Sequence, residues 1–156
     1  MFRLKESVHI DAPIDRCFLL STSIPIVART IGLTPSDAAP FKHTGLVLNG
    51  DRVLWRGRKF GFPQFHETLI TGYDRPGFFQ DSMARGRFQF FQHDHHFDDI
   101  AGHTHVYDII HFSLPFGPLG KLVARKILIP HVMNLLRERH QLIKRLAEGD
   151  GWREYL

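Results

Sequence analysis

The C-terminal stretch from Gly117 to Gly149 constrains the fold more than any other part of the chain. Pro118 suits the first position of a helix, because its missing N–H would be unpaired there anyway. Gly149 suits the left-handed position just past the end of a helix. The residues between these two signals, about 30 of them, would form a helix about 45 Å long. The sequence therefore predicts one long C-terminal helix.

Apolar residues in the second half of this stretch recur at helical spacing and predict one buried face. They are Val132, Leu135, Leu136, Leu142, Ile143 and Leu146. Pro130 lies in the middle of the stretch, where it removes one backbone hydrogen bond and is expected to kink the helix. Most of the preceding chain has the alternating pattern of strands. We therefore expect the kinked helix to lie against a sheet and to enclose a space with it.

The first part of the chain is expected to form one strand followed by two short helices. Phe2–Ile10 alternates apolar and polar residues, as a half-buried strand does. One helix is expected through Cys17–Leu20, and a second over Ile24–Ile31, ending at Gly32. Thr34–His43 is rich in Pro, Ala, Ser and Asp, which indicates a loop.

An antiparallel meander is expected after this loop. The expected strands are Gly45–Leu48, Arg52–Phe60, Phe65–Thr71, Phe78–Ala84, Phe88–Asp98 and Thr104–Phe112. The dipeptide Asn49-Gly50 and the run Asp74–Gly77 are typical turn sequences between strands. The order of elements indicates an α+β domain with about seven strands and with its helices on one face of the sheet.

The length of 156 residues indicates a single domain, residues 1–156, that is long enough to bury a core. Eleven of the fourteen Phe residues lie between Phe60 and Phe116, in the predicted sheet. Aromatic residues are typical of strands and also of the walls of apolar cavities. Cys17 is the single cysteine, which rules out an internal disulfide, and we expect its thiol to be buried.

Positive charge is concentrated in the C-terminal part of the chain. From Gly117 onward there are eight Lys and Arg residues and four acidic ones, whereas the first 116 residues are balanced. A basic helix can attract nucleic acid or an anionic membrane, although a solvated outer face is the simpler explanation. We expect no nucleic-acid partner, because the chain has no zinc-finger cysteines, no RNA-binding aromatic motif and no long basic run.

The N-terminus does not have the pattern of a signal peptide, because Arg3, Lys5 and Glu6 interrupt its apolar residues. No apolar run approaches the length of about 18 residues that a membrane span needs. We therefore expect a cytoplasmic protein without stable membrane insertion.

Four phrases of the sequence, together with this order of elements, resemble a known superfamily. They are Val53–Gly61 (VLWRGRKFG), Phe88–Phe97 (FQFFQHDHHF), Thr104–Asp108 (THVYD) and Leu114–Gly120 (LPFGPLG). The chain resembles the START-like (SRPBCC) superfamily, which includes birch-pollen-allergen-like proteins, polyketide cyclases and dehydrases, and lipid-transport domains. The resemblance implies a helix-grip fold, in which a curved antiparallel sheet wraps around a long C-terminal helix and leaves an apolar cavity. Because the superfamily contains both enzymes and carriers, the resemblance leaves the activity open.

Histidine is concentrated in the two last predicted strands, where six of the eleven histidines lie between His93 and His111. Side chains alternate across a strand, so a single face of Phe88–Asp98 carries Phe91, His93, His95 and Phe97. The phenylalanines at both ends of this set favour the interpretation that it points inward, toward the helix.

On the next strand the more apolar face should also point toward the helix, and it carries Thr104, Val106, Asp108, Ile110 and Phe112. A pairing that places Phe97 opposite Thr104 brings His93 opposite Asp108. We expect these two side chains to form a charge-assisted hydrogen bond inside the cavity. Glu67, from a neighbouring strand, is expected to project into the same space.

The cluster around His93 and Asp108 has four interpretations. It can be a polar pair that fixes strand register in the cavity wall, or a polar anchor for the head group of an apolar ligand. It can be an acid/base pair in which His93 is the base and Asp108 orients it. It can also be a metal site formed by His93, His95 and Asp108, although without cysteines or a second carboxylate at established spacing this signal is weak.

Arg139 is the one charge on the apolar stripe of the predicted helix. Its stem can pack there while its head reaches solvent, or its guanidinium can face the cavity rim and bind a carboxylate or phenolate. Trp55 can be an aromatic residue of the pocket or a residue of the core, and the core is the expected place.

The function that we expect from the sequence is the binding of a hydrophobic or aromatic small molecule, without a cofactor, between sheet and helix. The residues expected to contact it are Glu67, Phe91, His93, His95, Phe97, Val106, Asp108, Ile110 and Arg139. Two alternatives stay open. One is an enzyme of the cyclase or dehydratase kind that uses His93 and Asp108 to move a proton. The other is an interaction module whose basic C-terminal helix docks on a protein or an anionic membrane.

Overall fold

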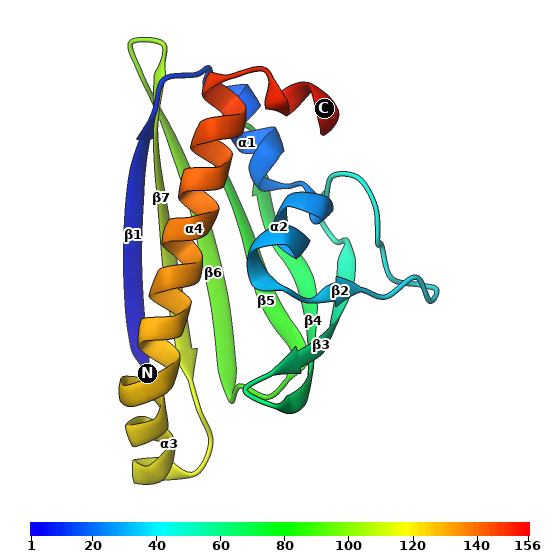
Figure 1. Ribbon diagram of the computed structural model, residues 1–156, viewed down its shortest axis with the longest axis vertical. Helices are drawn as coiled ribbons and strands as arrows, with labels where there is room; N and C mark the ends of the chain where they lie inside the picture. The colour runs from blue at the N-terminus through cyan, green and yellow to red at the C-terminus, as the bar shows by residue number, and fades with distance from the viewer.

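The computed structural model describes residues 1–156, and its main feature is a curved, seven-stranded antiparallel sheet laid against a long C-terminal helix (Figure 1). The strands are β1 (Phe2–Ile10), β2 (Thr34–Pro35), β3 (Arg52–Lys59), β4 (Phe62–Asp74), β5 (Phe78–Gly86), β6 (Phe90–Ile100) and β7 (His103–Ser113). Their order in the sheet is β1-β7-β6-β5-β4-β3-β2. The predicted α+β helix-grip architecture and its meander are therefore confirmed.

Two short helices follow β1, namely α1 (Ile14–Ser21) and α2 (Ile24–Ile31), and both pack against the C-terminal helix (Figure 1). The Ser23 hydroxyl accepts a hydrogen bond from the Ile26 N–H and so caps the start of α2. Gly32 ends α2 at a φ of +68°, a left-handed conformation that glycine adopts without strain. The expectation of a helix that stops at Gly32 is confirmed.

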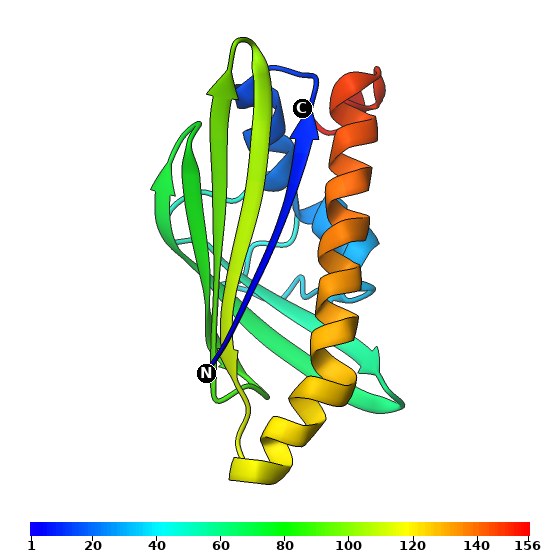
Figure 2. The same cartoon turned by 90° about the vertical axis from the view of Figure 1, so that its left-hand side faces the viewer.

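The C-terminal helix is continuous but has three parts, α3 (Gly117–Val123), a π-helical segment (Ala124–Leu128) and α4 (Ile129–Glu148). Pro118 lies in the first turn of α3, as expected. Pro130 lies in the first turn of α4, directly after the π-helical segment. Because proline has no N–H to donate, the backbone around it departs from the regular ladder. Figure 2 shows the resulting bend between α3 and α4.

Three local expectations were wrong. Gly149 is not left-handed, because its φ is −98° and the chain turns from there into a short 3₁₀ helix, Gly151–Glu154. Gly45–Leu48 forms only an isolated bridge between Leu46 and Ser23. In this segment the carboxylate of Asp51 accepts the Leu48 N–H at 2.7 Å, so that group is not available to a ladder. Finally, β4 begins at Phe62, three residues before the expected start of this strand at Phe65.

The main core lies between the sheet, α1 and the C-terminal half of α4. Phe18 of α1 is fully buried at its centre and makes edge-on contacts with the rings of Tyr73, Phe79 and Phe97. Cys17 is buried beside it. A separate cluster around Trp55 covers the β3 end of the sheet, so Trp55 is a core residue, and it also lines the cavity described below. None of the helices combines the length and the apolar composition of a membrane span.

Substitution of Phe18 by alanine should lower the free energy of unfolding by about 3–5 kcal/mol, because it removes a buried ring and leaves a cavity. Phe116→Ala is the matched control, since Phe116 is 80% exposed and its truncation should change the free energy by less than about 0.5 kcal/mol. Urea denaturation of the two variants measures both values. Similar midpoints for the two variants would contradict this description of the core.

Candidate functional site

A cavity of about 620 Å³ lies between the sheet and the C-terminal helix. Of the 35 residues that line it, 22 are hydrophobic, and they come from α2, β3, β4, β6 and α4 among other elements. At one end the lining residues include Phe60, Phe62 and Phe65 of the β3–β4 hairpin and Ile127 of the π-helical segment, which are all exposed. The cavity therefore opens to solvent between the hairpin tip and the start of the long helix.

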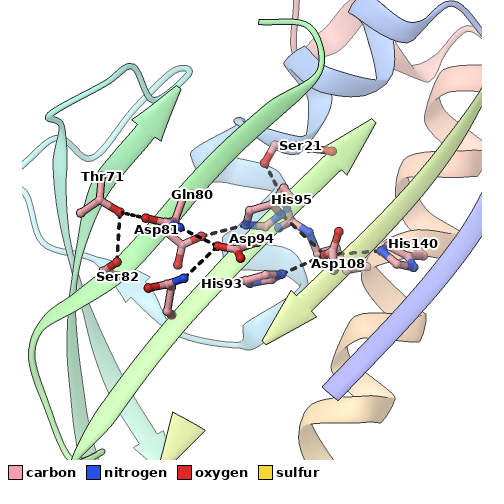
Figure 3. A network of polar contacts seen from close by, with 12 residues as sticks. Ser21, Thr71, Gln80, Asp81, Ser82, His93, Asp94, His95, Asp108 and His140 are labelled. Carbon is pink, nitrogen blue, oxygen red and sulfur yellow. Dashed lines mark hydrogen bonds and ion pairs between the residues drawn. The ribbon is translucent and has the colours of Figure 1, made fainter. Parts of the chain in front are cut away.

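A buried polar cluster forms part of the cavity wall and continues behind it (Figure 3). The cluster consists of Asp81 on β5, His93 and His95 on β6, Asp108 on β7 and His140 on α4. Asp81, His93 and His95 line the cavity. Asp108 and His140 lie behind them, between the sheet and α4, and both are almost completely buried.

The strand register brings the carboxylates next to the histidines. Asp81 lies opposite His93, and Asp108 lies opposite His95. The hydrogen bonds run diagonally, because His93 Nε2 is 2.9 Å from Asp108 Oδ2 and His95 Nε2 is 2.8 Å from Asp81 Oδ2. His95 Nδ1 lies 3.6 Å from Asp108 Oδ2. The expected hydrogen bond between His93 and Asp108 is therefore present.

The expected pairing of the two strands was wrong by two residues. Phe97 lies opposite Val106 instead of Thr104, because the strands continue to a tight two-residue turn at Ala101-Gly102. Both turn residues have positive φ, +52° and +87°, as in the tight turns that suit hairpin twist. A shift of two residues keeps every side chain on its face of the sheet. The error consequently left the inward set of residues unchanged.

The charges of the cluster are set by burial and by neighbouring groups. Burial alone would raise the pKa of Asp108, but the surrounding histidines, His95 above all, hold this pKa well below 3.8. Burial lowers the pKa of His93, and the neighbouring His95 lowers it further. Burial also acts to lower the pKa of His95, yet the carboxylates of Asp108 and Asp81 outweigh it and raise this pKa. Asp108 is thus a carboxylate and His93 a neutral imidazole at pH 7.

Arg139 is buried in the cavity wall instead of reaching solvent. Only 7% of the residue is exposed, and its guanidinium donates one hydrogen bond to the carbonyl oxygen of Ser21 at 2.7 Å. Burial lowers the pKa of Arg139, and the negative charges of Asp108 and Asp81 partly offset this effect. Of the two interpretations of Arg139 from the sequence, the structure has the one in which the cation lines the cavity.

Not every residue expected at the site lies there. Glu67 lies on the other face of β4, where its carboxylate accepts hydrogen bonds from Arg52 at 2.9 Å and Arg85 at 2.8 Å. The inward positions of β4 are those of its neighbours His66 and Thr68, which do line the cavity. The expectation was wrong because apolar residues occur on both faces of β4, so the sequence pattern does not single out one face as inward.

The other expected contact residues divide into two groups. Phe91, His93, His95, Ile110 and Arg139 line the cavity. Phe97 and Val106 belong to the main core, because Phe18 of α1 covers that end of the sheet. Asp108 does not line the cavity either, because it lies behind the histidines, between the sheet and α4. Two members of the polar cluster were missed in the sequence. Asp81 shares a strand face with Phe79, and this alternation is the sequence signal that could have identified Asp81 as an inward residue. His140 follows Arg139 on the helix, and its Nε2 lies 3.4 Å from Asp108 Oδ2.

The arrangement of the strands and helices recurs in solved structures. The ZhuI aromatase/cyclase from Streptomyces sp. R1128 matches with a TM-score of 0.72 at 11% identity, over 94% of this chain and 93% of that one. A START superfamily protein from Mycobacterium smegmatis matches with a TM-score of 0.59 at 11% identity, over 90% of this chain and 98% of that one. The fold is START-like.

A third START-like match concerns a larger protein. The di-domain ARO/CYC BexL from the BE-7585A biosynthetic pathway matches with a TM-score of 0.68 at 15% identity, over 95% of this chain and 50% of that one. No protein-family model and no curated protein matches the sequence. At such identities the likeness shows the START-like fold alone, so the function has to be argued from the cavity and its polar cluster.

Asp108→Asn should lower the free energy of unfolding at pH 7 by about 3–5 kcal/mol, because it breaks a buried charged network. The folded pKa of Asp108 lies below its unfolded value of about 3.9. The contribution of the Asp108 carboxylate to the free energy of unfolding is therefore fully present above the unfolded pKa and is lost as the pH falls through the folded pKa. The stability difference between wild type and variant should accordingly narrow below about pH 4.

Urea denaturation at a series of pH values measures this difference. Asp98→Asn is the control, because Asp98 is an exposed aspartate on the same strand as His93. A difference between wild type and Asp108→Asn that stays constant down to acidic pH would contradict the assignment.

Proposed function

We propose that this START-like chain binds a hydrophobic or aromatic small molecule in the cavity between its sheet and α4. The observation that carries the proposal is the cavity itself, with its volume of about 620 Å³ and its mostly apolar wall. Pockets for small organic ligands typically measure about 300–1,000 Å³ and combine apolar walls with a few polar groups. The apolar mouth supplies a route of entry for such a ligand.

The polar groups of the wall favour a ligand with an oxygen-bearing head. Arg139 makes one hydrogen bond to Ser21, so other N–H groups of its guanidinium can donate to a ligand oxygen. His93 and His95 line the same cavity. A phenol, enol, carbonyl or carboxylate at one end of an apolar molecule would match these groups, while its body contacts Phe91, Ile110 and the apolar face of α4.

Val132→Trp should reduce ligand binding strongly, because Val132 lines the cavity and the larger side chain fills it. We expect the affinity for the apolar fluorescent probe anilinonaphthalene sulfonate to fall at least about tenfold. Asn134→Trp is the matched control, because Asn134 is exposed on the same helix and does not line the cavity. Val132→Trp should bind the probe more weakly than the wild type, whereas Asn134→Trp should bind it with wild-type affinity. Equal affinities of the two variants would argue against the cavity as the binding site.

Native mass spectrometry of the protein from its own host supplies an independent test and identifies the ligand. A stoichiometric apolar adduct supports the proposal. A chain that carries no adduct, and that also binds none of a panel of fatty acids, quinones and aromatic polyketides, contradicts it.

A second candidate function is acid/base catalysis on a polyketide-like substrate, as in a cyclase or dehydratase. The hydrogen bond between His93 and Asp108 favours it, because a carboxylate behind an imidazole orients the ring. Burial lowers the pKa of His93, so the neutral ring that lines the cavity can accept a proton. Two of the START-like structures described above are named as aromatase/cyclase or ARO/CYC proteins, which is consistent with this reading.

The catalytic candidate predicts a separation of binding from turnover. His93→Ala should keep the affinity for a ligand identified by mass spectrometry within a few-fold and abolish its conversion, followed by chromatography of the products. His96→Ala is the control, because His96 is on the opposite face of β6. The catalytic candidate would be rejected if the wild-type protein did not convert the ligand or if His93→Ala converted it fully. Only the binding function would then remain.

An interaction role for the basic end of the C-terminal helix stays a prediction. Phe116, Leu119 and Leu122 are exposed in and before α3, next to Lys121 and Arg125. This mixture of apolar and basic side chains beside the cavity mouth supports docking on an anionic surface. Association that weakens as the salt concentration rises is the measurement that tests it.

A further inference from the structure

We propose that Asp81, His93 and His95 form a binding site for a first-row divalent transition metal in the cavity wall (Figure 3). Each of the three offers one ligand atom, and these atoms all lie within 4.8 Å of one another. Ligand atoms that bind one zinc ion at about 2.0–2.2 Å in tetrahedral geometry lie about 3.3–3.6 Å apart, so side-chain rotations have to bring the more distant of these atoms closer together. This inference does not depend on the identity of any organic ligand.

The strands place the three side chains for this purpose. His93 and His95 are two residues apart on β6, so both rings lie on the inward face. Asp81 lies directly opposite His93 on β5, and its Oδ2 is 2.8 Å from His95 Nε2. One carboxylate oxygen and two imidazole nitrogens thus converge from two hydrogen-bonded strands, which form a rigid support.

Asp108 has the position of a residue that orients a metal ligand from behind. It holds His93 through Nε2 at 2.9 Å, which leaves Nδ1 as the nitrogen of His93 that is free to bind a metal. Metal-binding histidines commonly donate their other N–H to a carboxylate in this way, which fixes the ring and raises its basicity. Asp108 is itself 1% exposed, so this hydrogen bond is shielded from water.

The chemistry of the donor set indicates which metals fit. Two imidazoles and one carboxylate suit zinc and ferrous iron, and they leave further coordination positions open. Because all three residues line the cavity, the open positions face the space that a ligand would occupy. The chemical class of ligand is then a molecule with an oxygen donor, such as a phenolate, enolate or carboxylate, on an apolar body.

The charges of the wall are compatible with a dication. Asp81 and Asp108 are two carboxylates, and Arg139 is the one permanent cation that lines the cavity close to them. The competing account is that a proton on His95, between Asp81 and Asp108, supplies the missing positive charge without any metal. The two accounts differ in whether a metal ion binds in one-to-one ratio, so a titration separates them.

The test is a titration of chelator-treated protein with Co²⁺ and with Zn²⁺. Wild-type protein should bind one ion per chain, with a visible Co²⁺ spectrum typical of low coordination number, and Zn²⁺ should displace the Co²⁺. Asp81→Ala and His93→Ala should lose this binding. Asp108→Asn should weaken it by about 10–100-fold, because only the orienting hydrogen bond is lost.

His96→Ala is the matched control, because it removes a histidine from the same strand but from the other face, and it should bind the metal as wild type does. Circular dichroism and binding of anilinonaphthalene sulfonate show that each variant is folded and keeps its cavity. If a variant fails this check, the Co²⁺ spectrum of the wild-type protein still tests the metal site. The energy and intensity of its bands depend on whether nitrogen and carboxylate ligands bind the ion.

Weak, non-saturating binding that is equal in wild type, His93→Ala and His96→Ala would overturn the metal site and leave the proton-bridged account. That result would not affect the proposed cavity function, because probe binding is measured without metal. Conversely, one-to-one metal binding in a chain that binds no apolar molecule would uphold the metal site and reject the proposed cavity function.

Discussion

The packing of one long helix against a curved sheet is the constraint on which the rest of the structure depends. At its C-terminal end α4 is held tightly, because Leu142 and Ile143 join Phe18 in the main core. Toward its start the helix bends at the π-helical segment, and the cavity opens there. Apolar surface on both walls stays unfilled in the middle, so the same side chains that drive folding also line the binding space.

The polar cluster is the second feature that follows from this geometry. Buried charges are costly unless they are paired, and Asp108 is surrounded by His93, His95 and His140 for that reason. The cluster lies where three strands and α4 meet, and three of its five residues line the cavity. The proposals for ligand binding, proton transfer and metal binding all rest on these few side chains, because they are the polar groups that combine burial with access to the cavity.

The similarity to solved START-like structures bears on the fold and not on the chemistry. Identities of 11–15% are compatible with a shared arrangement of strands and helices while the side chains inside the cavity differ. The fold leaves the chemistry of the cavity open. The histidines in the cavity wall are the side chains from which the chemistry of this chain has to be argued.

The sequence by itself determined the order of elements and the inward faces of β6 and β7, because periods of two and of 3.6 residues are local properties of the chain. The contact of His93 with Asp108 was predicted from a pairing that was wrong by two residues, and it is present because the two side chains meet diagonally. It did not determine the strand register, which the tight turn at Ala101-Gly102 set, or the face of β4 that Glu67 occupies, because apolar residues lie on both faces of that strand. Only the tertiary structure brought Asp81 and His140 to the cluster and left Arg139 buried without an ion pair. These contacts join residues far apart in the chain, so they depend on how the strands and helices pack, which no local pattern encodes.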